Sequence, residues 1–276
     1  MNNKLREFLK LARIENALIA IIVVFVGVKA AGGYIPFFKT LLLALSMFFL
    51  NIFANVQNDI VDLESDRANR KGRPLVKGTV SETEATYFAI SSLILSLIFA
   101  LFSGFKVFLV VSLIAILVYF YNTHCKKVVL VSNLTVALVT ALVFVVAGVL
   151  VHAVRYAIVP ALIAFYYNFM REIIKDWADI EGDKSVGITT VPMVLGHKPT
   201  TLLILLLTFL FIPFLLIPYV AGVFGRAYLY ISVAFCAVPL FASFLMIKKD
   251  KEGLKLYSKI TKYLMIPLLL AIYLGV

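Results

Sequence analysis

Acidic residues occur at the same spacing in two places along the chain. The segments NDIVDLESD and KDWADIEGD both contain the pattern Asp-x-x-Asp-x-x-x-Asp, and the two patterns start 117 residues apart. The six carboxylates are those of Asp59, Asp62, Asp66, Asp176, Asp179 and Asp183. Because a helix turns by about 100° per residue, three residues at this spacing lie within an arc of about 60°. The pattern therefore predicts two helices that each have a carboxylate-lined face, although Gly182 could end the second helix early and leave Asp183 on a turn.

Three carboxylates on one helical face repel one another, and two such faces opposite each other repel more strongly. Without compensation, this repulsion raises the pKa values of the carboxyl groups. A hard divalent cation removes the problem, and Mg²⁺ typically takes one or two carboxylates together with phosphate oxygens and water. A single acidic motif would be an ordinary solvated helix end. Two motifs of the same spacing instead favour a Mg²⁺ site that shares a diphosphate.

Basic residues that are expected near both motifs could neutralise the phosphate charge that remains. These cations are Arg67, Lys126, Arg171 and Lys184. The two motifs are not chemically equivalent, because Lys175 occupies the position in the second motif that Asn58 occupies in the first. We expect Lys175 to contact phosphate rather than metal.

The helices that carry these motifs belong to a very apolar chain. Of its 276 residues, 62% are hydrophobic and only 15% are charged, which is more apolar than a soluble domain of this size. Runs of about 20 apolar residues are long enough to cross a bilayer. The predicted spans are 14–34, 36–57, 82–103, 107–124, 128–150, 154–175, 200–221, 227–247 and 256–275. We therefore expect an all-α membrane protein, a bundle of nine transmembrane helices in one domain over residues 1–276. Its polar segments are about 55–81, 121–127 and 171–200.

The distribution of basic residues predicts the orientation of this bundle. Most of the 26 Lys and Arg residues fall on the side of the N terminus, and the positive-inside rule makes that side cytoplasmic. The cations on the other side are Lys29, Lys39, Lys106, Arg155 and Arg226. Topology and anionic lipids account for the basic charge without a nucleic-acid partner. Both acidic motifs then lie at the cytoplasmic face, so the protein is expected to be a multi-pass cell-membrane protein with its site on that side.

Several segments together resemble the UbiA superfamily of intramembrane prenyltransferases. That family pairs an NDxxDxxxD motif with a DxxDxxxD motif on a nine-helix bundle, and both motifs are present here without gaps. The flanking segments agree, although Lys71 stands where the family commonly has proline. These segments are NRKGRPLVKG (69–78), YNTHCKK (121–127), DKSVGITTVP (183–192) and ARIENALIA (12–20). The resemblance covers nearly the whole chain and implies a Mg²⁺-dependent prenyltransferase.

The resemblance also implies roles for individual residues. The implied metal ligands are Asn58, Asp62, Asp66, Asp179 and Asp183, with Asp59 and Asp176 as additional ligands. The implied catalytic residues are Asp62, Asp66, Asp179, Asp183 and Lys126. The implied substrate-binding residues are Arg13, Asn16, Arg67, Arg70, Lys71, Arg73, Tyr121, Arg171, Lys175 and Lys184. Among these, Arg13, Arg70, Lys71 and Arg73 are candidates for a phosphate on the acceptor. The prenyl chain is expected beside Phe48, Phe49 and Phe53, although these rings could equally serve packing or face lipid.

The segment REIIKDWADIEGD most resembles an archaeal branch of the family that makes ether lipids. That branch transfers a geranylgeranyl group from geranylgeranyl diphosphate to geranylgeranylglyceryl phosphate. The implied partners are thus a prenyl diphosphate, a lipid-like acceptor and membrane lipids. One alternative keeps the reaction and changes the acceptor to an aromatic acid, a quinone precursor, a tetrapyrrole or haem. Another alternative is a cation-coupled transporter, although transporter acids usually lie singly near the bilayer midplane.

Overall fold

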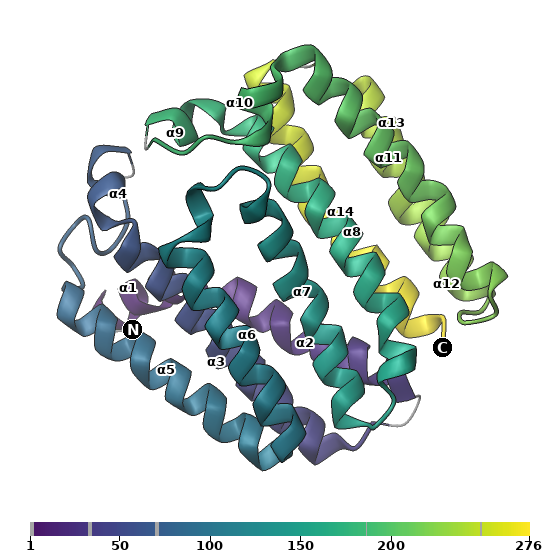
Figure 1. Cartoon of the computed structure of the whole chain (residues 1–276), viewed down its shortest axis with the longest axis horizontal. Helices are drawn as coiled ribbons and strands as arrows, with labels where there is room; N and C mark the ends of the chain where they lie inside the picture. Colours follow the sequence, from purple (N-terminus) through teal and green to yellow (C-terminus); the bar gives the residue numbers. More distant parts are fainter. Residues whose placement is uncertain (1–2, 33–34, 70–71, 186, 249) are drawn as a thin grey trace.

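The computed structural model describes residues 3–32, 35–69, 72–185, 187–248 and 250–276, and these residues form helices joined by short connections, with no strand among them (Figure 1). The first half contains α1 (Asn3–Ala12), α2 (Ile14–Gly32), α3 (Phe37–Val61), α4 (Leu63–Asn69), α5 (Glu82–Ser103), α6 (Phe105–Thr123) and η1 (Cys125–Lys127). The second half contains α7 (Val131–Leu150), α8 (Val154–Ala178), α9 (Ile180–Ser185), α10 (Val191–Leu195), α11 (His197–Val220), α12 (Arg226–Ser232), η2 (Val233–Ala237), α13 (Val238–Met246) and α14 (Lys251–Leu274).

The predicted all-helical membrane bundle is confirmed, but the count of nine spans is not. Over the described ranges, eight helical segments are long and apolar enough to cross a bilayer. They are α2, α3, α5, α6, α7, α8, α11 and the continuous segment 226–246 that contains α12, η2 and α13. The ninth predicted span, 256–275, overlaps α14, where Lys259 and Lys262 interrupt the apolar sequence. Large apolar side chains such as Ile90, Ile94 and Ile98 on α5 are exposed at helical spacing, as expected of a lipid-facing surface.

The two halves of the bundle repeat the same arrangement. Helices α3 and α8 each contain 25 residues, and they begin and end 117 residues apart, the same offset as the acidic motifs. Helices α2 and α7 also begin 117 residues apart. Each is preceded by a residue with positive φ, 47° at Arg13 and 67° at Leu130. The pseudo-repeat suggested by the aspartates therefore extends to the helices that carry them.

Small residues allow the helices of each half to pack closely. The buried face of α5 consists of Ala85, Ala89, Ser92, Ser96, Ala100 and Ser103. The Ser96 hydroxyl lies 3.3 Å from the Ser46 hydroxyl of α3. Between α7 and α8, a Cβ added to Gly148 would lie 2.5 Å from the Cβ of Ala157. Since apolar burial does not drive helices together within lipid, such close backbone contact supplies much of the packing attraction.

The acidic motifs cross helix ends instead of continuing the helices. Helix α3 ends at Val61 and α8 ends at Ala178, so the second aspartate of each motif lies between a long helix and a short one. The backbone angles are φ −86°, ψ 1° at Asp62 and φ −120°, ψ 24° at Asp179, outside the α-helical range. The prediction of two unbroken carboxylate-lined helices was therefore wrong, and so was the role given to Gly182, which lies inside α9.

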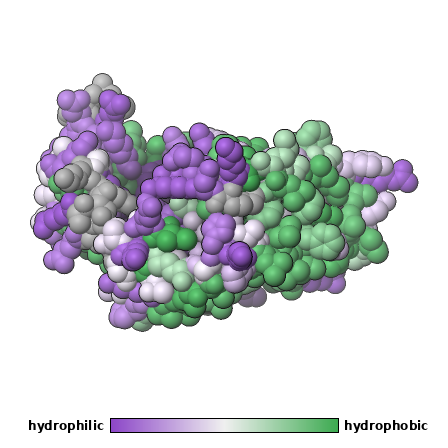
Figure 2. Space-filling view, turned by 90° about the horizontal axis from the view of Figure 1, so that it is seen from above, coloured by the Kyte–Doolittle hydropathy of each residue, from purple (hydrophilic) through white to green (hydrophobic). Residues whose placement is uncertain are grey.

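The short helices that follow the motifs gather at one end of the bundle. Helices α4, α9 and α10 lie at the same end in Figure 1, and the turn between α11 and α12 lies at the opposite end. Seen from above in Figure 2, hydrophilic residues gather on the side of α4 and α9, and hydrophobic residues cover the side of α11 and α13. The fold thus places both acidic motifs at one polar end of an apolar bundle.

Candidate active site

A cavity of about 550 Å³ lies between the two halves of the bundle. Its walls come from α2, α3 and α6 of the first half and from α7, α8 and α9 of the second half. One part of the wall is apolar and contains Ala54, Val118, Val136, Val139 and Ile188. The rest is polar and carries charges of both signs. An amphipathic ligand with a charged head and an apolar tail fits such a lining.

The second acidic motif faces this cavity directly. Asp176, Asp179 and Asp183 all line it, together with Glu172 one helical turn before Asp176. Asp176 is buried, and the Asn133 side-chain amide donates a hydrogen bond of 2.7 Å to its Oδ2. Four carboxylates on one side of the cavity leave a concentration of negative charge that a cation would relieve.

Glu172 is held by the cations on either side of it. Its Oε1 accepts a hydrogen bond of 3.2 Å from Arg171 Nη1, and its Oε2 accepts a hydrogen bond from Lys175. Both cations also line the cavity. The α8 wall therefore presents acidic and basic groups within one helical turn.

The carboxylates of the first motif are held by cations from outside the motif. The Nη1 of Arg73 donates to Asp59 Oδ1 at 2.7 Å and to Asp66 Oδ2 at 2.5 Å. Asp59 Oδ1 also accepts from Arg13 Nη2 at 2.7 Å. Asp59 and Asp66 are only 4% and 3% exposed, so these contacts compensate buried charges.

Lys126 from η1 pairs with the remaining aspartate of the first motif. Its Nζ contacts the Asp62 carboxylate and donates a 2.9 Å hydrogen bond to Asn58 Oδ1. Asn58 and Lys126 line the cavity, whereas Asp62 does not. The first motif therefore contributes to the cavity mainly through its amide and its bound cations.

The structure brings most of the predicted site residues into one cavity. Those that line it are Arg13, Asn16, Asn58, Arg73, Tyr121, Lys126, Arg171, Lys175, Asp176, Asp179 and Asp183. Arg67 and Lys184 are exposed and do not line it. Arg70 and Lys71 lie outside the described residues.

Several polar residues of the cavity were not among the predicted site residues. They are Asn51, Asn55, Asn122, Asn133, Glu172 and Thr190. Two signals could have located some of them. Asn51, Asn55 and Asn58 recur at helical spacing along α3, and Asn133 follows Asn16 by the 117 residues of the repeat.

The aromatic residues expected beside the prenyl chain pack between helices instead. Phe48 and Phe49 meet edge to face with their ring centroids 5.3 Å apart, and Phe49 stacks on Phe99 of α5 at 5.7 Å. Phe53 is buried in the core. None of the three lines the cavity, so the packing interpretation holds and the apolar wall consists of aliphatic side chains.

The donor set of the cavity is compatible with Mg²⁺ that shares its coordination with a phosphate ligand. Over the part of the chain that the structure describes, no three His, Cys, Asp or Glu side chains form a cluster that could hold a metal ion alone. Mg²⁺ does not require such a cluster, since it commonly takes one or two carboxylates with phosphate oxygens and water. Carboxylate and amide oxygens line this cavity beside Lys126, Arg171 and Lys175, which suit the phosphates.

Residues 18–262 match the UbiA prenyltransferase family. The chain therefore belongs to this family and is a multi-pass membrane prenyltransferase. It is 32% identical over 286 residues to the digeranylgeranylglyceryl phosphate synthase of Methanococcus aeolicus, a match that covers 100% of this chain and 99% of that protein.

Solved structures show the same fold. A structure of digeranylgeranylglyceryl phosphate synthase superposes with a TM-score of 0.80 at 31% identity, covering 99% of this chain and 98% of that one. A UbiA homologue from Archaeoglobus fulgidus, bound to GPP and Mg²⁺, superposes with a TM-score of 0.63 at 20% identity, covering 96% of this chain and 99% of that one.

Proposed function

We propose that the protein transfers a geranylgeranyl group from geranylgeranyl diphosphate to the hydroxyl of geranylgeranylglyceryl phosphate. The products are digeranylgeranylglyceryl phosphate, an archaeal ether-lipid precursor, and pyrophosphate. The observation that carries this proposal is the single cavity that brings together the carboxylates of the second acidic motif, Asn58 beside the first motif, five cations and an aliphatic wall. The full-length similarity to digeranylgeranylglyceryl phosphate synthase supports the choice of acceptor.

The reaction requires the allylic C–O bond of the diphosphate to break and the acceptor oxygen to bond to the same carbon. Negative charge develops on the departing diphosphate, and fixed cations at that position lower the barrier. Lys126, Arg171 and Lys175 line the cavity from both halves and are suited to this role. The acceptor hydroxyl needs little activation against an allylic carbocation, and its proton passes to a carboxylate of the site or to the pyrophosphate.

The metal ligands in this proposal are the oxygen donors of the two motifs. They are Asn58, Asp62, Asp66, Asp179 and Asp183, with Asp59 and Asp176 as additional ligands. When bound, Mg²⁺ supplies charge neutralisation at the diphosphate. The relative from Archaeoglobus fulgidus that binds GPP and Mg²⁺ supports this choice of metal.

The lipid tail of the donor is assigned to the aliphatic part of the cavity. Val118 on α6 and Val136 and Val139 on α7 provide an apolar wall beside the charged groups. This wall excludes water from the reacting carbon, which protects the allylic carbocation from hydrolysis. Arg13, Asn16 and Arg73, which also line the cavity, are suited to the acceptor phosphate. Arg67, Arg70, Lys71, Tyr121 and Lys184 remain candidate substrate contacts.

Product analysis tests this proposal. Purified protein receives labelled geranylgeranyl diphosphate, Mg²⁺, and either geranylgeranylglyceryl phosphate or 4-hydroxybenzoate. We expect label only in the glyceryl ether, and we expect EDTA to abolish transfer until excess Mg²⁺ restores it. If only 4-hydroxybenzoate is labelled, the assigned acceptor is wrong but the protein is still a prenyltransferase. If proteoliposomes take up ions in a metal-dependent way and no prenyl group is transferred, both the acceptor and the prenyl-transfer activity are wrong.

A further inference from the structure

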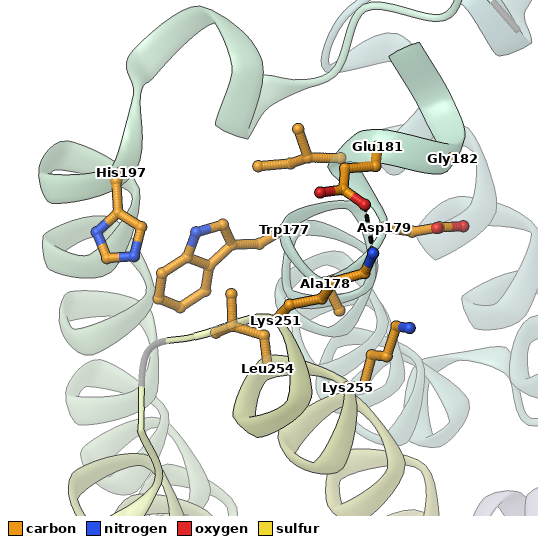
Figure 3. Close-up of a pocket in the computed structure, with 10 residues that line it drawn as sticks. Trp177, Ala178, Asp179, Glu181, Gly182, His197, Lys251, Leu254 and Lys255 are labelled. Carbon is orange, nitrogen blue, oxygen red and sulfur yellow. Dashed lines mark hydrogen bonds and ion pairs between the residues drawn. The ribbon is translucent and has the colours of Figure 1, made fainter. Parts of the chain in front are cut away.

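A second cavity, of about 350 Å³, lies at the polar end of the bundle between α8, α9, α11 and α14 (Figure 3). We call it the tryptophan pocket. Its polar lining consists of Trp177, Asp179, Glu181, His197, Lys251 and Lys255. Asp179 lines both this pocket and the large cavity, so the two are separated by the second acidic motif.

Trp177 brings a buried hydrogen-bond donor to the pocket. The residue is 2% exposed, and its Nε1 has no hydrogen-bond acceptor among the described residues. The ring lies against His197, with centroids 5.4 Å apart, and its nitrogen edge is turned away from Leu254 (Figure 3). A buried N–H group without an acceptor is unfavourable, because it has lost its hydrogen bond to water. An oxygen atom of a ligand would remove this cost.

Positive charge reaches the pocket from two helices. Lys251 and Lys255 extend into it from the first turns of α14. His197 is the first residue of α11, a helix of 24 residues that has no side-chain cap at its N terminus. The partial positive charge of such a terminus adds to that of the two lysines.

The carboxylates of Glu181 and Asp179 also line the pocket, but they compete only weakly with a ligand anion for its positive charge. Glu181 forms an ion pair with Lys251, which holds the pKa of Glu181 below its usual value. The Glu181 side chain is 75% exposed, so exchanging this pair for another anion costs little. The Asp179 carboxylate packs against Gly182, because a Cβ added to Gly182 would lie 2.4 Å from Asp179 Oδ1. In Figure 3 this carboxylate points away from Trp177.

We propose that the tryptophan pocket binds the phosphate headgroup of an anionic lipid. Membrane span α8 ends at this pocket, and membrane span α11 begins at it. The pocket therefore lies at the depth of the lipid phosphates. Leu254, Ala178 and Ile180 provide an apolar side for the glycerol and the first methylene groups. This site is separate from the large cavity and does not depend on which acceptor the enzyme uses.

The protein's single tryptophan reports directly on this pocket. Trp177 emission is recorded in nanodiscs of phosphatidylcholine and again after part of the lipid is replaced by phosphatidylglycerol. We expect a shift in emission with phosphatidylglycerol and the loss of that shift in the Lys251→Gln/Lys255→Gln variant. Glycerol phosphate added in neutral detergent forms a third arm. A response to glycerol phosphate at concentrations as low as those of the lipid would identify a site for soluble phosphates and overturn the lipid assignment.

The matched control is Lys259→Gln/Lys262→Gln, which removes the same charge from α14 at exposed positions outside the pocket. This variant should retain the shift. The proposal fails if wild-type emission does not respond to phosphatidylglycerol, if the response persists in Lys251→Gln/Lys255→Gln, or if both double variants lose it equally. Unchanged Trp177 emission in phosphatidylcholine and unchanged circular dichroism verify that each variant is folded.

Discussion

At the scale of single residues, Arg73 is central to the first acidic motif. One guanidinium nitrogen bridges Asp59 and Asp66, which lie seven residues apart and are both buried. Buried carboxylates are tolerated when a cation compensates them, and removing one member of such a group costs about 3–5 kcal/mol. Arg73 therefore supports the geometry of the motif as well as lining the cavity.

The Arg73→Gln substitution should lower the stability of the protein by about 3 kcal/mol, because it removes the charge shared by two buried carboxylates. Thermal unfolding in detergent, followed by circular dichroism, measures this loss. Arg6→Gln is the control, since Arg6 is exposed and its substitution should change stability by less than about 0.5 kcal/mol. Equal unfolding temperatures for Arg73→Gln and the wild type would contradict the bridging role.

Sequence reasoning found the aspartates because their spacing is regular, but it could not find most of their partners. Nothing in the residue types indicates that Arg73 would bridge Asp59 and Asp66 instead of binding phosphate. Glu172 was passed over as a ligand, although its contacts with Arg171 and Lys175 make it part of the cavity wall. Such pairings depend on how the chain returns after the helix ends, and this is decided by tertiary packing.

At the scale of secondary-structure elements, the two motifs share one local geometry. Each long helix ends just before the second aspartate, and a short helix follows. The third aspartate of each motif still donates its backbone N–H to the carbonyl of the second, at 2.8 Å for Asp66 and 2.9 Å for Asp183. Residue spacing predicted that each motif continues its helix, and neither Asp62 nor Asp179 is adjacent to a proline or glycine that would mark the break. The break in each helix is a feature of the fold that local propensity does not encode.

Gly182 leaves room for the Asp179 carboxylate in the second motif. A Gly182→Ala substitution would place a Cβ 2.4 Å from Asp179 Oδ1, so the carboxylate would have to rotate. Displacing a reacting or binding group by about 1 Å can cost about 10²-fold in rate. We therefore expect Gly182→Ala to reduce prenyl transfer by about that factor while leaving the unfolding temperature nearly unchanged.

The control for this prediction is Gly225→Ala, because the nearest atom to its added Cβ is 3.5 Å away and the site is distant. Its transfer rate should match the wild type. A Gly182→Ala enzyme with full activity would mean that the Asp179 position is not needed for catalysis.

At the scale of the whole molecule, the repeat explains why one cavity collects residues from distant parts of the sequence. Helices α2 and α3 are matched by α7 and α8, and α2 packs against both α3 and α7. The two motif-bearing ends therefore meet at the same polar face. The sequence predicted this face from its charges, but the extent of the repeat became visible only from helix lengths and from the paired backbone angles of Arg13 and Leu130.

The orientation of this face in the membrane is a further prediction. In a Cys125→Ser background, Arg226→Cys should react with a membrane-impermeant maleimide in intact cells, because the positive-inside rule places it outside. Lys77→Cys, in the connection between α4 and α5, should react only after permeabilisation, because the same rule places that connection inside. Both positions are exposed, so access to reagent depends on the side of the membrane. The reverse labelling pattern would place the acidic motifs outside the cell.

The central claim is that the two acidic motifs act together in one prenyl-transfer site. Single-turnover transfer from geranylgeranyl diphosphate to geranylgeranylglyceryl phosphate is measured for Asp62→Asn, Asp179→Asn and the double variant. Asp250→Asn serves as a control, since asparagine also caps a helix N terminus and Asp250 caps α14. Each single variant should lose about 10²-fold or more in rate. Because residues that act as a unit are non-additive, the double variant should be little slower than the worse single variant. Losses that multiply, or variants as active as Asp250→Asn, would contradict a shared site.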